Sequence, residues 1–215
     1  MSNITNPQTC CGCGACVNIC PKSCISMERD PEGFFYPSVD TAGCVSCGLC
    51  EKVCPVTHSP AIPAGNPRVY AAFGEAEDRQ DSSSGGVFPR LARKTLEQGG
   101  LVFGAAMAEG MDFAQHVAID SLSQLPELRG SKYLQSRMGS CYQQAREALN
   151  AGRPVLFTGT PCQIEGLMNY LGRDYQNLLT ADVVCHGVPS EKLWKKYLEY
   201  QQKRYGSRVK EVRFR

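Results

Sequence analysis

The sequence predicts an α+β protein in which a small cysteine-rich domain precedes an incomplete α/β domain with a mixed, partly parallel sheet. Three observations support this prediction. Eight of the thirteen cysteines fall in two regularly spaced runs within the first 54 residues, a proline-rich segment follows, and strand-like apolar runs then alternate with amphipathic helical patterns. We therefore divide the 215 residues into a cysteine-rich domain at 1–57, a linker at 58–68 and an α/β domain at 69–215.

The two cysteine runs share one spacing, Cys-x2-Cys-x2-Cys-x3-Cys-Pro. In bacterial two-cluster ferredoxins, three thiolates of such a run bind one [4Fe-4S] cluster, and the fourth, which precedes the proline, reaches the other cluster. The spacing therefore predicts a ferredoxin domain with two [4Fe-4S] clusters that carries electrons. Crossed ligation assigns to the first cluster Cys10, Cys13, Cys16 and Cys54, and to the second Cys44, Cys47, Cys50 and Cys20.

Zinc and disulfide bonds explain these cysteines less well. Zinc sites pair two separated Cys-x2-Cys knuckles and need four ligands, which leaves the third cysteine and the trailing Cys-Pro of each run without a role. A disulfide framework needs an oxidising compartment, and residues 1–21 do not have the pattern of a signal peptide. Cys11 and Cys24 lie beside the expected ligands without extending the spacing, and we interpret them as small buried thiols packed near a cluster.

The segment between the two runs predicts a β-hairpin. Residues 24–28 and 34–39 read as strands, and Asp30-Pro31-Glu32-Gly33 is typical of a turn between them. Because Cys10 and Cys44 are 34 residues apart and begin identical runs, the domain is expected to be an internal duplication. The linker that follows is rich in proline, which disfavours both helix and sheet, and its His58 is expected to be solvated.

The composition argues against a membrane-spanning protein and against a nucleic-acid-binding protein. Hydrophobic residues make up 42% of the chain, enough for a core, and no run of eighteen apolar residues predicts a transmembrane segment. The net charge of +2 is too small to indicate nucleic-acid binding. Residues 1–57 carry three Lys and Arg against five Asp and Glu, so the cysteine-rich domain is acidic. We expect a cytoplasmic protein in a reducing environment.

The α/β domain is predicted from alternating patterns. Val87, Leu91 and Leu96 mark one face of a helix that stops at Gly99 and Gly100, and Ser190 is expected to cap the last helix. The predicted strands are 69–73, 101–107, 113–119, 154–158, 178–185 and 209–214, and the predicted helices are 87–96, 138–151, a helix carrying Ile164 to Leu171, and one carrying Leu193 to Leu198.

Two cysteines follow predicted parallel strands. In an open α/β sheet, ligands bind beyond the carboxyl ends of the strands, where Cys162 and Cys185 would face one crevice if their strands are neighbours. These thiolates would then ligate a further cluster. Alternatively Cys162 is a nucleophile with His186 as its base, because His186 is poorly placed to activate Cys185. Two buried structural cysteines remain a third interpretation.

A second candidate site begins at 82–86, where three serines and two glycines precede a helix. Hydroxyls, free backbone N–H groups and the positive end of a helix dipole suit a phosphate or pyrophosphate. The segment is neither a Walker loop nor a G-x-G-x-x-G motif, and an ordinary N-cap explains it equally well. Lys132 adds a cation that would meet the same anion or lie in a solvated turn.

Taken together, the chain resembles the coenzyme F420 hydrogenase/dehydrogenase beta-subunit family. The resemblance is carried by the two ferredoxin runs and by four later blocks at 83–88, 130–136, 159–164 and 182–187. It implies a flavoprotein with FAD in the α/β domain, a third [4Fe-4S] cluster ligated by Cys162 and Cys185, and coenzyme F420 or a related acceptor. The cofactor contacts implied by the resemblance are Ser83, Ser84, Gly85, Gly86, Lys132, Thr160, Gln163 and His186.

Family members normally extend beyond a sequence like 209–215, so we interpret the chain as an N-terminal portion. The resemblance implies electron relay between the ferredoxin clusters and a flavin or deazaflavin acceptor, with a ferredoxin, hydrogenase or dehydrogenase subunit as redox partner. The rival hypothesis is a ferredoxin-like electron-transfer or docking module whose α/β domain binds no redox cofactor.

Overall fold

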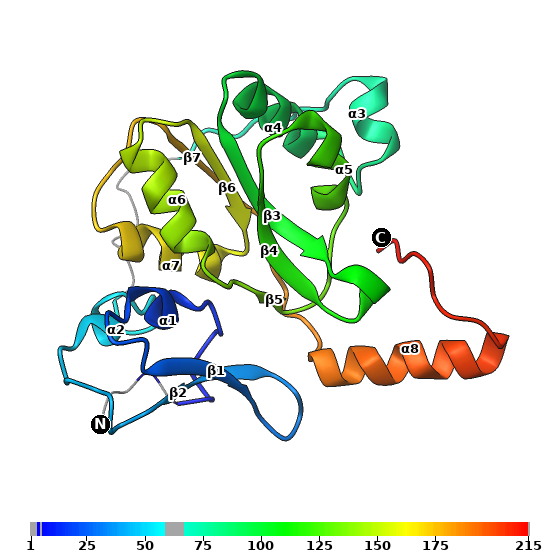
Figure 1. Ribbon diagram of the computed structural model, residues 1–215. Coiled ribbons are helices and arrows are strands. Elements are labelled where there is room, and N and C mark those ends of the chain that lie inside the picture. The colour runs from blue at the N-terminus through cyan, green and yellow to red at the C-terminus, as the bar shows by residue number, and fades with distance from the viewer. Residues whose placement is uncertain (1–3, 5, 59–66, 215) are drawn as a thin grey trace.

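The computed structural model describes residues 4, 6–58 and 67–214, so most of the predicted linker lies outside the described residues. A small N-terminal unit packs beneath an α/β unit (Figure 1). The helices and strands in chain order are α1 (Ala15–Ile19), β1 (Ile25–Arg29), β2 (Phe35–Val39), α2 (Leu49–Lys52), α3 (Ala76–Gln80), α4 (Val87–Glu97), β3 (Leu101–Met107), η2 (Glu109–Met111), β4 (Ala114–Ile119), η3 (Leu122–Gln124), α5 (Leu125–Leu128), β5 (Ser136–Arg137), α6 (Cys141–Asn150), β6 (Val155–Gly159), α7 (Pro161–Leu171), β7 (Leu178–Asp182) and α8 (Glu191–Tyr205).

The N-terminal unit repeats one loop-and-helix pattern on either side of the predicted hairpin. Strands β1 and β2 pair antiparallel, with Ile25 opposite Val39 and Arg29 opposite Phe35. Gly14 and Gly48 occupy equivalent N-cap positions of α1 and α2, with φ of 78° and 72°. Only glycine adopts this left-handed conformation without strain, which explains why each cysteine run contains a glycine after its second cysteine. The internal duplication is therefore visible in the backbone.

The α/β unit contains a five-stranded sheet with the order β5-β4-β3-β6-β7. Strands β3 and β4 form an antiparallel pair, whereas β6 is parallel to both β3 and β7, and β5 is parallel to β4. The predicted mixed, partly parallel sheet is thus confirmed. Because β3, β6 and β7 run in the same direction, their carboxyl ends meet at one edge of the sheet.

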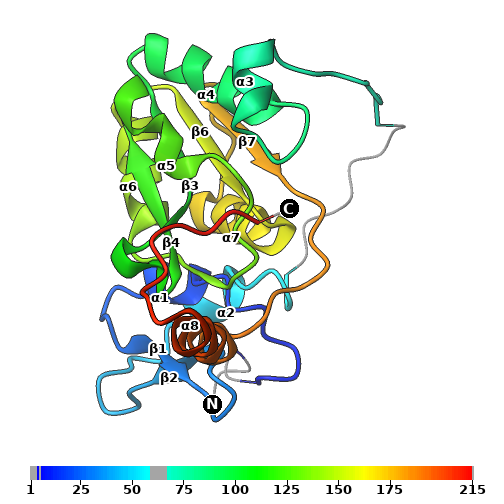
Figure 2. The ribbon, with the colours of Figure 1, turned by 90° about the vertical axis from the view of Figure 1, so that its right-hand side faces the viewer.

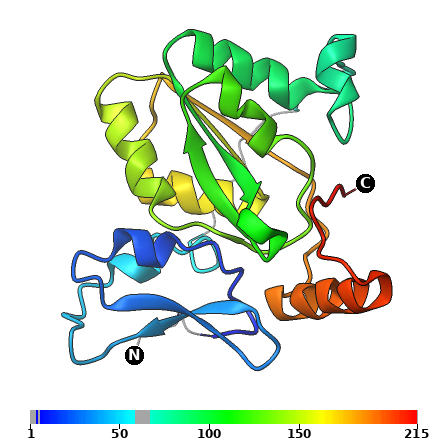
Figure 3. The same cartoon turned by 45° about the vertical axis from the view of Figure 1, so that its right-hand side comes forward.

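Helices cover both faces of this sheet (Figure 3). Helices α6 and α7 pack on one face, where Tyr142 and Leu167 contact Phe103 and Phe157. Helices α4 and α5 cover the other face with Ala92, Leu96, Leu125 and Leu128. Alternate residues of β3 supply the two layers, since Phe103 belongs to the first cluster and Val102 to the second.

Three predicted strands differ in the structure. Residues 69–73 form no strand, and Val69 is 90% exposed, because in the described structure these apolar side chains pack against no neighbouring strand. Residues 209–214 also lie outside a ladder: Val209, Val212 and Phe214 instead pack with Trp194 and Leu198 of α8. The strand expected at 178–185 ends at Asp182, and β5 was not predicted.

Helix α8 begins as predicted at Ser190, whose hydroxyl accepts a hydrogen bond from the Leu193 N–H. It lies beside the β1–β2 hairpin (Figure 2), and its Trp194 and Leu198 also pack with Ala114 of β4. Among the described residues, no helix combines the length and apolar character required to cross a membrane.

Candidate functional site

The structure divides the cysteines of the two runs between two cavities in the N-terminal unit. One cavity is lined by the first three cysteines of the first run and the last cysteine of the second, namely Cys10, Cys13, Cys16 and Cys54. The other is a hollow of about 750 Å³ whose lining includes Cys20, Cys44, Cys47 and Cys50. Each cavity is thus lined by the four cysteines that crossed ligation would assign to one cluster, and the ligation itself stays a prediction. We call these groups the inner set and the outer set.

Backbone amides are aimed at the sulfurs in the same way in both sets. The Gly12 N–H donates to Cys10 Sγ at 3.4 Å, and the Ser46 N–H donates to Cys44 Sγ at 3.4 Å. Such bonds stabilise a thiolate and tune the potential of a bound cluster. Burial nevertheless raises the pKa of Cys10, so these amide bonds alone do not make the sulfur a thiolate; a bound metal would do so.

The thiols of the inner set also perturb one another. Burial, followed by the charges of Cys10, Cys54 and Cys50, raises the pKa of Cys16 to about 12. Four crowded thiolates need cations between them, and a coordinating metal deprotonates a thiol outright. Four cysteine sulfurs are the donor set of a [4Fe-4S] cluster, so the chemistry of these residues fits such a cluster. Among the described residues, no three His, Cys, Asp or Glu side chains are already grouped closely enough to hold a single metal ion.

Cys11 and Cys24, the two extra cysteines, have different surroundings. Cys24 is buried as expected, and its sulfur lies 3.4 Å from Cys20 Sγ. Cys11 is exposed, which contradicts the predicted buried thiol. It lies beside Cys162, and hydrogen bonding to Cys11, together with burial, raises the pKa of Cys162. Sequence reasoning missed this juxtaposition because the two residues are far apart in the chain.

The inner set lies directly against α7 of the α/β unit. A Cβ atom added to Gly166 would meet Cys13 Sγ at 3.2 Å, the Tyr142 hydroxyl at 3.2 Å and Ala15 Cβ at 3.4 Å. The Tyr142 hydroxyl lies 3.0 Å from the Cys13 carbonyl and 2.9 Å from the Gln163 carbonyl, so its proton is shared between the two units. Close packing and a shared hydrogen bond thus fix the inner cysteines on α7.

Cys162 and Cys185 follow adjacent parallel strands, as the sequence analysis required. Gly159 of β6 pairs with Asp182 of β7, and each cysteine comes three residues later. Cys162 is half-buried and lies 3.2 Å from Thr160 Oγ1, whereas Cys185 and His186 are exposed. The Gly187 N–H donates to Cys185 Sγ at 3.4 Å, the same arrangement as at Cys10 and Cys44.

A buried hydrogen-bonded chain fixes the start of α7. Gln163 Nε2 donates to Ser136 Oγ at 2.9 Å, Ser136 Oγ lies 3.0 Å from His116 Nδ1, and His116 Nε2 lies 3.0 Å from the Thr158 carbonyl. Because that carbonyl only accepts, Nε2 carries the hydrogen and Nδ1 accepts from Ser136. Burial lowers the pKa of His116 to about 4, so the ring is neutral.

Gln163 and Thr160, both implied as cofactor contacts, have structural partners in this chain of bonds. The Thr160 N–H donates to Gln163 Oε1 at 2.9 Å, and the two residues form a capping box. With Oε1 and Nε2 both used, the Gln163 side chain positions the α7 N-terminus. Thr160 is only half-buried, and its hydroxyl remains beside Cys162.

One hydrogen bond joins the serine–glycine segment to the block at 130–136, and an anion site there stays a prediction. Gly86 is the N-cap of α4, and the Ser131 N–H donates to Ser83 Oγ at 2.9 Å. Ser84 is exposed and Gly85 half-buried. Burial lowers the pKa of Lys132 to about 8, and its ammonium donates to the carbonyls of Glu127 and Arg129. Since α4 runs antiparallel to β3, this group lies near the edge where the parallel strands end.

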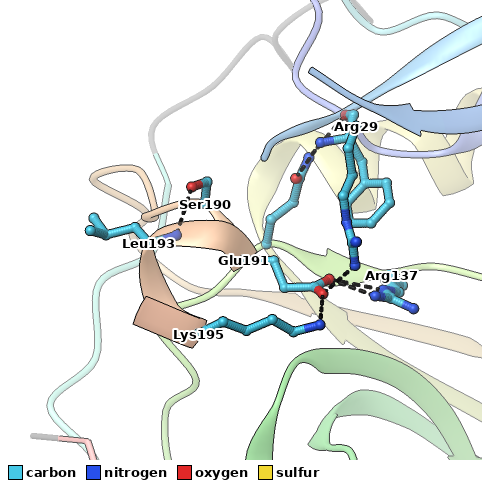
Figure 4. Close-up of polar contacts among 8 residues, drawn as sticks. Arg29, Arg137, Ser190, Glu191, Leu193 and Lys195 are labelled. Carbon is cyan, nitrogen blue, oxygen red and sulfur yellow. Dashed lines mark hydrogen bonds and ion pairs between the residues drawn. The ribbon is translucent and has the colours of Figure 1, made fainter. Parts of the chain in front are cut away.

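An ion-pair cluster joins the hairpin to α8 and β5 (Figure 4). The Glu191 carboxylate is 3% exposed and contacts the guanidinium groups of Arg29 and Arg137 and the ammonium of Lys195. Burial opposes ionisation, but the hydrogen bonds from Arg137 and Lys195 outweigh it and lower the pKa of Glu191. Ser190 Oγ also donates to the Glu32 carbonyl at 2.6 Å. These contacts hold the two units in one arrangement.

Fold and site together define an iron–sulfur protein with a two-cluster N-terminal unit. Comparison with known families supports this class, because residues 9–58 match the model described as a 4Fe-4S dicluster domain. Residues 152–215 match the model for the C-terminal part of the coenzyme F420 hydrogenase/dehydrogenase beta subunit. The two matches together support the resemblance to the coenzyme F420 hydrogenase/dehydrogenase beta-subunit family that the sequence motifs indicated. No curated protein matched it in a sequence comparison.

Proposed function

We propose that this protein is an iron–sulfur oxidoreductase subunit that relays electrons between two [4Fe-4S] clusters and a flavin or deazaflavin acceptor held by the α/β unit. The observation that carries the proposal is the seating of the inner cysteine set on α7, the helix that follows β6. Cys13 packs on Gly166, and Cys11 faces Cys162. A cluster in the inner set would therefore lie beside the edge where an α/β sheet binds ligands.

The candidate acceptor site is formed by Ser83 to Gly86, Ser131 and Lys132. The start of α4, which has no side-chain cap, and a half-buried ammonium suit the pyrophosphate of FAD or the phosphate of coenzyme F420. When bound, FAD would supply the exchange between one-electron and two-electron chemistry, and coenzyme F420 would accept or donate a hydride. The contribution of the chain is to hold the phosphate-bearing group at the start of α4 and to keep the α7 N-terminus fixed through Gln163.

Cys162 and Cys185 are proposed as ligands of a third cluster at the same edge. Thr160 Oγ1 beside Cys162 and the Gly187 N–H on Cys185 are suited to stabilise thiolates. The family match implies a subunit of a multi-protein complex, so the redox partner is expected to be a ferredoxin or a hydrogenase or dehydrogenase subunit.

The first experiment is anaerobic reconstitution of the whole protein with iron and sulfide, followed by an iron count and electron paramagnetic resonance. About eight irons per chain indicate two clusters and about twelve indicate a third. Cys54→Ser is expected to remove the inner cluster and Cys20→Ser the outer one. Cys141→Ser is the matched control, because Cys141 is buried, lines neither cavity and donates to the His116 carbonyl. Iron-free protein would refute the proposal.

The second measurement is titration with FAD, followed by quenching of its fluorescence. Binding that weakens in Lys132→Met, and that weakens in the native protein as pH rises through about 8, supports the acceptor site, because the lysine then loses its charge. Full cluster content without flavin or F420 binding would favour the electron-transfer module instead.

A further inference from the structure

The two cysteine loops have the same sequence spacing but opposite surroundings. In the inner set Cys13 and Cys16 are buried, covered in part by α7. In the outer set residues 45–49 are all exposed, including Cys47 itself. Val45 is 58% exposed and Leu49 36% exposed, so two apolar side chains stand at the surface beside the outer cysteines. An internal duplication would by itself give two equally exposed loops. The α/β unit covers the loop of the inner set and leaves the loop of the outer set exposed.

The surface around the outer set is acidic. Glu28 and Asp30 line the same hollow as Cys44 and Cys47, and Asp40 is exposed close by in the chain. The lining holds three carboxylates, since Glu51 joins Glu28 and Asp30, against two basic residues. Of these, Arg29 is paired with Glu191 and Lys22 is exposed. The cysteine thiolates of a bound cluster add further negative charge. A partner that approaches this loop therefore meets an apolar centre with an acidic rim.

We propose that residues 45–49 form the docking surface for a small one-electron carrier protein whose contact face is basic. This inference rests on the proposed function and assigns a role to each cysteine set. The outer set exchanges electrons with the carrier, and the inner set exchanges electrons with the α/β unit. The charge complementarity carries the choice of partner, because opposite potentials steer association and fix orientation. The few apolar residues fit the small interfaces of transient redox complexes.

The test uses ferricytochrome c as a basic one-electron probe and menadione as a small uncharged one. The reconstituted whole protein is reduced, and its oxidation by each probe is followed by stopped flow. Val45→Lys places a positive charge at the centre of the surface and is expected to slow electron transfer to ferricytochrome c about tenfold at low salt. Transfer to menadione should stay unchanged. Raising the salt concentration should slow the native reaction with ferricytochrome c.

Leu122→Lys is the matched control, since Leu122 is similarly exposed (44%) but lies just beyond β4, at the amino end of β3. It should leave both rates unchanged. Equal rates for native and Val45→Lys protein, or a rate insensitive to salt, would overturn the docking surface. Iron counts and paramagnetic resonance spectra of each variant separate this outcome from failure of the proposed function, in which clusters are missing or cannot be reduced.

Discussion

At the scale of single residues, the polar interior is built around neutral His116. The ring is stacked on Phe157, with centroids 5.8 Å apart, and both nitrogens are bonded inside the protein. A charged imidazolium would place a second hydrogen on Nδ1, which the Ser136 hydroxyl can only meet by turning its own proton away. The arrangement therefore depends on the neutral form, in agreement with the pKa of about 4.

His116 should make the protein less stable in mild acid. Its pKa is lower in the folded state than in the unfolded chain, so the unfolded state binds the proton first as pH falls below about 6.5. Between pH 7.5 and 5.5 we expect a loss of about 1 kcal/mol in the free energy of unfolding from this residue. His116→Gln keeps one donor and one acceptor and should show a smaller loss. Urea unfolding of both proteins at the two pH values measures the difference, and equal losses would contradict the assignment.

At the scale of elements, sequence patterns succeeded where a segment carries its own signal. Helix α4 follows from its apolar stripe, and the β1–β2 hairpin follows from its turn residues. Residues 69–73 and 209–214 have equally strong strand composition but no ladder, because a strand needs a neighbour that composition does not specify. The second of these segments packs its apolar side chains on α8 instead.

In the candidate site, too, local features were predictable from the sequence and long-range contacts were not. The cysteine runs predict the inner and outer sets because both sets are formed by local loops and one short hairpin. Sequence patterns could not predict that Cys11 contacts Cys162 or that Gln163 holds the start of α7. They arise from the docking of α1 on α7, which no local pattern specifies.

Gly166 tests this docking. In an open helix, glycine to alanine stabilises a protein by about 1 kcal/mol. Here the new Cβ would contact Cys13 Sγ and the Tyr142 hydroxyl, so we expect Gly166→Ala to gain nothing and Gly166→Val to lose about 1 to 3 kcal/mol of unfolding free energy. Urea unfolding measures both variants, and electron transfer from the clusters to added flavin should slow in Gly166→Val. A Val variant as stable as the native protein would show that the helices are not held together at this point.

At the scale of the whole molecule, the N-terminal unit and the α/β unit are joined by contacts at two places. The inner cysteines pack on α7, and Gln135 reaches the hairpin, with its amide donating to the Phe35 carbonyl and accepting from the Phe35 N–H. On the other side, α8 contacts the hairpin turn through Ser190 and Lys192. An electron relay requires such a fixed arrangement, because transfer depends on the distance between centres.

Glu191 is the central charge of the α8 contact, and its removal should loosen the hairpin. Glu191→Gln keeps the shape but leaves Arg29, Arg137 and Lys195 facing one another around a neutral amide. Breaking a buried pair costs more than breaking an exposed one, but these cations are 37–46% exposed, so we expect a loss of about 2 kcal/mol. Glu75→Gln removes an exposed partner of Arg90 and should change the free energy of unfolding far less, because solvent screens that pair.

Hydrogen exchange shows which segments Glu191→Gln destabilises, whereas urea unfolding gives only the change in free energy for the whole protein. In Glu191→Gln, the amides of β1, β2 and the first turn of α8 should exchange faster, while those of β3 and β6 stay protected, because the carboxylate bridges the two units without contributing to the sheet. The native contact should also weaken in acid, since the lowered pKa of Glu191 means that its stabilisation is lost as pH falls through the folded value. Uniform acceleration across both units would instead show that Glu191 supports global folding, and the hairpin would then be held mainly by α7 and Gln135.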